Sequence, residues 1–158
     1  PMRAPSVFNF WRPGYVPPGT QAAAASLVVP EMQLAHEATL AGYVNYMRDN
    51  IAFGVGASAT VMVNGANVNR RDIQPDFTAE LALADRPEAL VERIDTLLMA
   101  GTMPAALRAE ISGAVASISI PAPNANGSNQ NQINTARRNR VNTAIFLTVV
   151  SPEFQVQP

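Results

Sequence analysis

The sequence predicts a mainly α-helical protein: a compact helical bundle with an N-terminal arm rich in aromatic residues and proline, and one small β-hairpin. Residues 5–19 combine four prolines with four aromatic side chains, which favours an extended segment. The dipeptide Asn64-Gly65 lies between two short β-prone runs. Apolar residues recur at helical spacing in three stretches, which are 30–53, 85–120 and 133–151. For 158 residues we expect one domain, 1–158.

Composition narrows the possible functions. Hydrophobic residues make up 47% of the chain and its formal net charge is −1, which disfavours bulk electrostatic binding to nucleic acid or to a membrane surface. No apolar run reaches the roughly 18 residues of a membrane-spanning helix. All eleven basic residues are arginine and cysteine is absent, so disulfides, thiol nucleophiles, cysteine-ligated zinc and lysine Schiff bases are excluded. We expect no cofactor, no metal, no nucleic acid and no membrane insertion.

The arm is predicted over residues 1–29, with a turn at Pro13-Gly14 and a short helix or turn within 20–29. Its aromatic residues are Phe8, Phe10, Trp11 and Tyr15. We interpret them as a strap whose rings fill gaps between helices, because aromatic clusters serve packing more often than binding. The alternative is an aromatic platform that binds carbohydrate.

A central helix is predicted over residues 30–53. Pro30 suits the first turn, where a missing N–H costs nothing, and Glu31 favours the positive end of the helix dipole. The apolar seam of this helix is formed by Leu40, Val44, Met47 and Ile51, and the last three lie within about 40° of Leu40 around the axis.

Polar residues interrupt the start of that seam at Gln33, His36 and Glu37. We interpret them as a structural hydrogen-bonding cluster that is sealed beneath the arm, since buried polar groups need partners. The alternative is a metal or acid–base site built from His36 and Glu37. This alternative lacks further ligands, because the chain has no second histidine and no cysteine.

An irregular or hairpin insert is predicted over residues 54–84. Gly54 and Gly56 stop the central helix, and residues 60–63 and 66–68 flank the Asn64-Gly65 turn. One or two helical turns follow within 77–84, with Asp76 as the N-cap.

An αα-hairpin is predicted over residues 85–120. Asp85 and Glu88 have the spacing of a capping box, and Pro87 lies in the first turn. Gly101 ends the first helix, and Thr102 can cap the second. With so short a link, the two helices run antiparallel.

A mobile polar loop is predicted over residues 121–132, followed by the last helix over 133–151, which Pro152 ends. This helix carries Arg137, Arg138 and Arg140. These arginines either bind an anionic partner or form a solvated face paired with local carboxylates.

Four blocks together resemble a known family. They are VFNFWRPGYVPPG (7–19), VVPEMQLAHEATLAGYVNYM (28–47), LVERIDTLLMAGTMPAALRAEI (90–111) and RVNTAIFLTVVSPEFQVQP (140–158). In order and spacing they resemble the closing section of the bacterial family catalogued as domain of unknown function 1800 (DUF1800). The resemblance implies the C-terminal part of a longer, exported protein in the periplasm or at the cell surface. It carries over no catalytic residues.

Two functions remain open from the sequence. The first is a non-catalytic structural or interaction module, whose partner is a protein, either a second copy or the N-terminal region of the same protein, or else a cell-surface polymer. The second is the C-terminal part of a secreted hydrolase acting on polysaccharide or a sulfated polymer. Its candidate residues are His36, Glu37 and Glu31, with Trp11 and Tyr15 as sugar-stacking surfaces. Six helical residues separate the two glutamates, which argues against a carboxylate pair.

Overall fold

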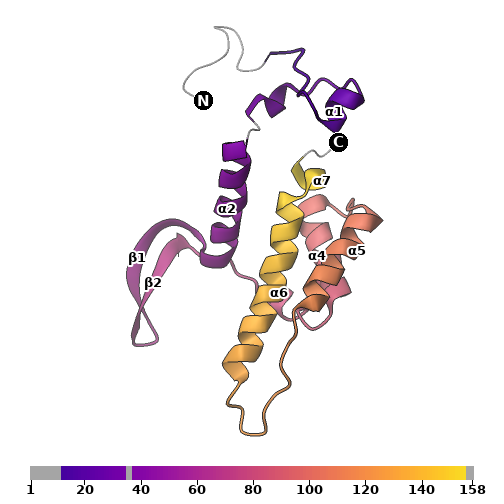
Figure 1. Ribbon diagram of the computed structural model, residues 1–158. Coiled ribbons are helices and arrows are strands. Elements are labelled where there is room, and N and C mark those ends of the chain that lie inside the picture. The colour runs from indigo at the N-terminus through magenta and orange to yellow at the C-terminus, as the bar shows by residue number, and fades with distance from the viewer. Residues whose placement is uncertain (1–11, 35–36, 156–158) are drawn as a thin grey trace. The chain divides into compact units, whose positions relative to one another are not determined.

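The computed structural model describes residues 12–34 and 37–155. Most of this described chain is helical, and its β-structure is one two-stranded antiparallel sheet. The predicted class, mainly α with one small hairpin, is therefore confirmed (Figure 1). By its internal contacts the chain divides into two compact units, Pro1–Asn45 and Tyr46–Pro158.

The described part of the first unit reverses direction within the predicted arm. The Tyr15 amide closes the turn at Pro13-Gly14 by donating to the Arg12 carbonyl at 3.1 Å, and the Val29 amide donates to the Tyr15 carbonyl at 2.9 Å. Between these two bonds lies α1 (Gln21–Ala24), which begins at Thr20, whose hydroxyl accepts from the Ala23 amide at 3.2 Å. Residues 12–29 are thus a turn, a one-turn helix and a chain reversal, not an extended run.

The predicted helix over 30–53 is divided into η1 (Pro30–Leu34), a 3-10 helix, and α2 (Glu37–Phe53). A side chain accounts for part of the difference. Gln33 Nε2 donates to the Pro30 carbonyl at 2.9 Å, which is the carbonyl that a continuous α-helix would offer to residue 34. No residue of α2 is buried.

The hairpin is confirmed and is longer than predicted. It consists of β1 (Val55–Val63) and β2 (Ala66–Ile73), paired in the register Val61↔Val68 and Val63↔Ala66. Asn64 and Gly65 have φ angles of 49° and 80°, as a type I′ turn requires. Where the pairing becomes irregular near Ser58, the Asp72 carboxylate accepts from the Ala57 amide at 3.0 Å.

Gly54 ends α2 at a position that needs glycine. Its φ is 83°, and a Cβ there would lie 2.1 Å from the Ile73 carbonyl oxygen. The Arg71 guanidinium donates to the Gly54 carbonyl and to Asn50 Oδ1, each at 2.8 Å, so a cation lies at the negative end of the helix.

The predicted N-cap of the short helix α3 (Thr78–Leu81) is wrong, because Phe77 holds the N-cap position and no side chain caps this helix. Asp76 lies one residue earlier, and its Oδ1 accepts from the Thr78 amide at 2.9 Å. The predicted capping box of α4 (Pro87–Met99) is wrong. Arg86 holds the N-cap position, and no side chain caps this helix. The Asp85 carboxylate accepts instead from Arg137, at 3.0 and 2.6 Å.

The link between α4 and α5 (Ala105–Ser117) is organised by Asp95 and not by Thr102. Asp95 is 1% exposed, accepts from the Met103 amide at 2.9 Å and forms an ion pair with Arg108. The Thr102 hydroxyl donates backwards to the Met99 carbonyl at 2.6 Å, and Pro104 precedes α5 without a side-chain cap.

The last two helices are α6 (Gln130–Val150) and α7 (Pro152–Gln155). The end of α6 confirms the prediction, but its start is three residues earlier than the predicted Ile133, so the polar loop is shorter. The Ser151 hydroxyl caps α7 by accepting from the Phe154 amide at 3.2 Å.

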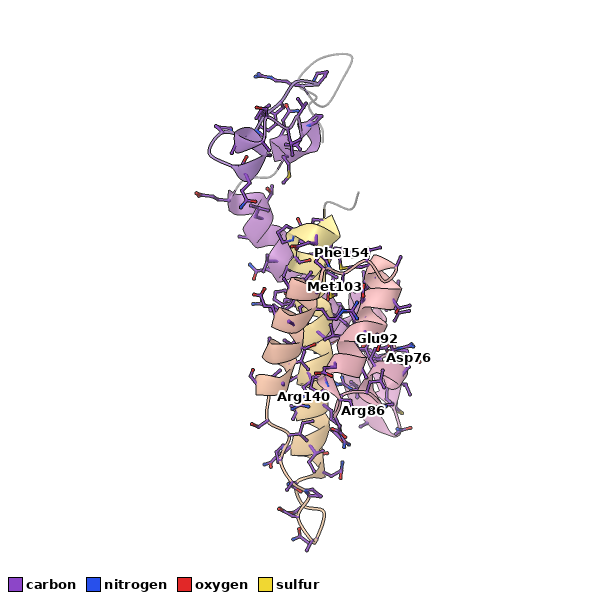
Figure 2. The ribbon with its side chains drawn as sticks, turned by 90° about the vertical axis from the view of Figure 1, so that its right-hand side faces the viewer. Asp76, Arg86, Glu92, Met103, Arg140 and Phe154 are labelled. Carbon is purple, nitrogen blue, oxygen red and sulfur yellow. The ribbon has the colours of Figure 1, made fainter. Side chains whose placement is uncertain are left out.

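Helices α4, α5 and α6 pack pairwise around one apolar core (Figure 1). The largest fully buried apolar residues are Leu90, Val91, Ile94, Ile111, Val115 and Val141. Met103 belongs to this core and Phe154 packs against it, both toward the same end of the helices (Figure 2). In the described ranges, no helix is both long enough and apolar enough to cross a membrane.

Candidate functional site

The polar cluster predicted at the start of the central helix is described only in part. Gln33 Nε2 donates to the Pro30 carbonyl and, at 3.4 Å, to the Arg12 carbonyl. Glu37 begins α2 and is exposed, so it is not sealed beneath the arm. His36 lies outside the described residues. Within the described ranges, no group of three or more histidine, aspartate and glutamate side chains could hold a metal ion.

The aromatic residues of the arm are described at one position. Tyr15 is half-buried, and its backbone joins the turn to Val29. Phe8, Phe10 and Trp11 lie outside the described residues, so the packing of the predicted strap stays a prediction.

The arginines of α6 serve three different purposes. Arg137 donates twice to the Asp85 carboxylate, which joins α6 to the segment before α4. The hydrogen bond from Arg137, together with its charge, lowers the pKa of Asp85, and the carboxylate in turn raises the pKa of Arg137. This pair matches the predicted solvated face.

Arg140 is buried and has a structural role. It is 9% exposed and donates to the Ile118 carbonyl at 2.8 Å and the Ala84 carbonyl at 3.0 Å (Figure 2). A third bond, at 3.4 Å, reaches the Ala116 carbonyl. Arg140 therefore satisfies carbonyl groups at the C-terminal end of α5, where a cation is favourable. It is not available to a partner.

Arg138 is the arginine of this cluster that remains available. It is exposed, and none of the ion pairs of the described chain involves it. Along the sequence, residues 111–152 contain three arginines and no acidic residue. In space, the nearest carboxylates from other segments are Asp85, which is paired with Arg137, and Asp76, which lines a cavity together with Arg138.

Arg138 belongs to a line of polar side chains along α6. We call this line the polar stripe; its members are Asn131, Thr135, Arg138 and Asn142. Their spacings of four, three and four residues place them on one face of the helix. Over eleven residues the stripe is about 16 Å long.

Two open hollows run beside this stripe. One has a volume of about 600 Å³ and is lined by Leu81 of α3 together with Asn131, Asn134, Thr135, Arg137 and Arg138. The other, of about 380 Å³, lies against the loop after α5 and shares Asn131 and Thr135 with the first. The outer half of the stripe is therefore a ridge between two hollows.

The inner end of the stripe is Asn142, whose Oδ1 is buried and has no hydrogen-bond partner among the described residues. An unsatisfied buried acceptor costs about 1–3 kcal/mol, so this amide is exceptional among buried polar groups. Sequence analysis missed it, as it missed Asn131 and Thr135. The available signal was an asparagine between the apolar residues Val141 and Ala144, where a helix facing a core is expected to be apolar.

The fold and this surface define a mainly α-helical protein with one polar, positively charged helix face. Comparison of the chain with protein-family models, with curated proteins and with solved structures finds no match.

Proposed function

We propose that this chain is a non-catalytic interaction module that binds an acidic, extended segment of a protein partner along the polar stripe of α6. The observation that carries the proposal is Arg138, an exposed guanidinium without an ion pair in the described chain, between amide and hydroxyl side chains. A guanidinium binds a carboxylate through two parallel hydrogen bonds.

The neighbouring side chains favour a peptide over other anions. Asn131 and Asn134 each offer both a donor and an acceptor, which is what a peptide group requires. The length of the stripe, about 16 Å, corresponds to about five residues of extended chain. Among the described residues, no aromatic side chain lines either open hollow, so these residues offer a sugar ring no stacking surface there.

A larger groove, of about 960 Å³, lies between α4 and α5 and supports the proposal less well. Its rim carries charges of both signs, from Arg86, Glu88, Glu92 and Arg108, and Arg108 is already paired with Asp95. Charge complementarity therefore selects no partner there.

We also propose that the chain belongs to the DUF1800 family and functions in the periplasm or at the cell surface, as part of a longer protein. The four sequence blocks support this proposal. The partner segment would then come from the N-terminal region of the same protein or from a second copy.

The alternative of a secreted hydrolase has no support from the described geometry. Glu37 is exposed at the start of α2, and the Gln33 side chain bonds backbone carbonyls. A cell-surface polymer as partner remains an outcome of the following test.

The test is a titration of the chain with labelled peptides of alternating Glu and Ser, against matched peptides in which Gln replaces Glu. We expect the acidic peptides to bind and the neutral ones not to, with affinity falling as salt is raised. Arg138→Gln should weaken binding about fivefold, the effect of one exposed charge pair. Arg86→Gln, an exposed arginine away from the stripe, is the control and should change nothing.

Two results would contradict the proposal. One is an Arg138→Gln variant that binds the acidic peptide as tightly as the unaltered chain. The other is binding of an acidic polysaccharide in place of the peptide, which would identify a polymer as the partner.

A further inference from the structure

The hairpin of β1 and β2 has one edge that lacks the usual protection against pairing with another chain. Its sheet has two strands, so both edges are open among the described residues (Figure 1). From Ser58 to Val63, β1 has no charged residue, no proline and no irregularity in its pairing. Natural sheet edges carry such features because they prevent a further strand from adding to the sheet. The β1 edge is therefore able to accept one.

The pairing register shows which backbone groups lie on this edge. Val63 and Ala66 flank the type I′ turn and form a hydrogen-bonded pair, and such pairs alternate with non-hydrogen-bonded pairs along the hairpin. Met62, Thr60 and Ser58 belong to the non-hydrogen-bonded pairs, which directs their amide and carbonyl groups outward. In the described chain, no backbone hydrogen bond links these groups to another element.

The same register gives the hairpin an apolar face. Val61 and Val63 are half-buried on this face, and the other apolar side chains there are exposed; they are Ala59, Ala66 and Val68. On the opposite face, Met62 is 75% exposed. A two-stranded hairpin is only marginally stable by itself, whereas a sheet of three or more strands with an apolar face is stable. Additional strands would therefore stabilise this hairpin.

The β2 edge carries charge instead. Arg70 and Arg71 are adjacent in β2, and the Arg71 guanidinium is held by the end of α2. Two β2 edges brought together would place the arginines of both copies in one small sheet, whereas two β1 strands bring no charge. A second β1 therefore meets β1 without repulsion, and every copy of the chain supplies one.

We propose that β1 pairs with β1 of a second copy of this chain, antiparallel and around a two-fold axis at Thr60. In this register Thr60 lies opposite the partner's Thr60, and Ser58 lies opposite the partner's Met62, so every outward residue of the regular run is paired. Each of these pairs exchanges two hydrogen bonds, which gives about six across the interface. Ala59 then lies opposite the partner's Val61, so the two apolar faces join on one side of a four-stranded sheet.

This inference does not rest on peptide binding by the polar stripe. No residue of β1 lines either open hollow beside α6, and Arg138 takes no part in the strand pairing. The two interactions also respond differently to salt, because pairing through backbone groups involves no ion pair. Failure of one proposal therefore leaves the other unaffected.

The first experiment measures sedimentation and amide hydrogen exchange of the unaltered chain over a range of concentrations. The interface is small, so we expect a monomer in dilute solution and a dimer in concentrated solution. Protection should rise with concentration at the outward amides of Ser58, Thr60 and Met62, and not at those of Asn67 and Asn69 on the β2 edge. A chain that is still monomeric at about 1 mM would overturn the proposal, as would protection on the β2 edge. Fibres would also overturn it, because they indicate β1 paired with β2 of the next copy.

Charge variants at the two-fold axis test the register. Thr60→Lys places two like charges opposite each other and should weaken the dimer at least roughly tenfold, as should Thr60→Glu. An equal mixture of these two variants should dimerise again, which distinguishes lost pairing from a misfolded hairpin.

The matched control is Asn69→Lys. Asn69 lies directly across the hairpin from Thr60, so this variant adds the same charge to the β2 edge and should leave the dimer unchanged. A Thr60→Lys chain that dimerises as tightly as the unaltered chain would contradict the proposal. So would a mixture of the Thr60→Lys and Thr60→Glu chains that stays monomeric.

Discussion

Asp95 shows most clearly how one residue holds two helices in place. Its carboxylate accepts from the Met103 amide at 2.9 Å and pairs with Arg108, while its backbone carbonyl accepts from the Gly101 amide at 3.2 Å. These bonds hold the turn between α4 and α5, where Ala100 and Gly101 both have positive φ and Met103 is buried. Side chain and backbone of one residue therefore fix the whole connection.

We expect Asp95→Ala to lower the free energy of unfolding by about 1–3 kcal/mol, because it leaves the buried Met103 amide without its acceptor, whereas the exposed Arg108 guanidinium can turn to water. Asp95→Asn keeps an acceptor for Met103 and should cost less. Urea denaturation followed by circular dichroism measures both. If the alanine variant loses no more than the asparagine variant, the interpretation of Asp95 as a clamp is wrong.

Asp85 makes a smaller contribution that depends on pH. Its folded-state pKa is lowered by Arg137, so its stabilising effect is present above the usual carboxyl pKa of about 4 and is lost as pH falls through the lower folded value. Because the pair is exposed, we expect it to contribute about 0.2–1 kcal/mol.

The measurement compares the unaltered chain with Asp85→Asn in urea at about pH 7 and about pH 2.5. The difference in unfolding free energy should be present at the higher pH and should be smaller at the lower one. A difference of unchanged size in acid would show that Asp85 acts by something other than its charge.

At the scale of elements, the sequence predicts the turns and helix ends that are determined by residues adjacent in the chain. The hairpin was predictable because Asn64 and Gly65 alone set its turn, and the helix α6 ends where Pro152 forbids continuation. The hydrogen bond from the Thr78 amide to Asp76 is equally local, since the two residues are two positions apart, although Phe77 and not Asp76 holds the N-cap position of α3.

The helix starts that depend on distant residues were not predictable. Asp85 has the spacing of a capping box with Glu88. Its carboxylate instead accepts hydrogen bonds from Arg137, which lies 52 residues further along the chain. The sequence indicated Thr102 as the N-cap of α5. In the structure, the side chain that bonds the connection between α4 and α5 is Asp95, which lies in the preceding helix. Spacing in the sequence shows which bonds are possible, and tertiary contacts decide between them.

The candidate site was predictable to a similar degree. The arginines of α6 were recognised as a group, but their spacing could not show that Arg137 and Arg140 are used within the fold. The amides of the polar stripe were missed because exposed asparagines on a helix are ordinary. Only Asn142, with its buried oxygen, departs from what a solvated face requires.

At the scale of the whole molecule, the apolar core occupies a limited part of the chain. Every buried hydrophobic residue of the described ranges lies between Ala84 and Val149, within the second unit. None of these buried hydrophobic residues is a described residue of the first unit. A core of this size is expected to leave the protein marginally stable. The free-energy cost of creating one cavity in it is then a large fraction of the total free energy of unfolding.

The division into two units predicts that substitutions in one unit leave the unfolding of the other unchanged. Ile111→Ala empties a site that is 1% exposed and should lower the free energy of unfolding of the core by about 2–5 kcal/mol. Thr20→Ala removes the cap of α1, a change of about 0.5–2 kcal/mol within the first unit, and should not shift the unfolding transition of the core.

The appropriate measurement is amide hydrogen exchange of α4 to α6, because near-ultraviolet circular dichroism in urea does not distinguish the units by itself. In the Thr20→Ala chain, the opening free energy of the α4 amides could fall by as much as the free energy of the lost cap. That result would show that the two units unfold as one.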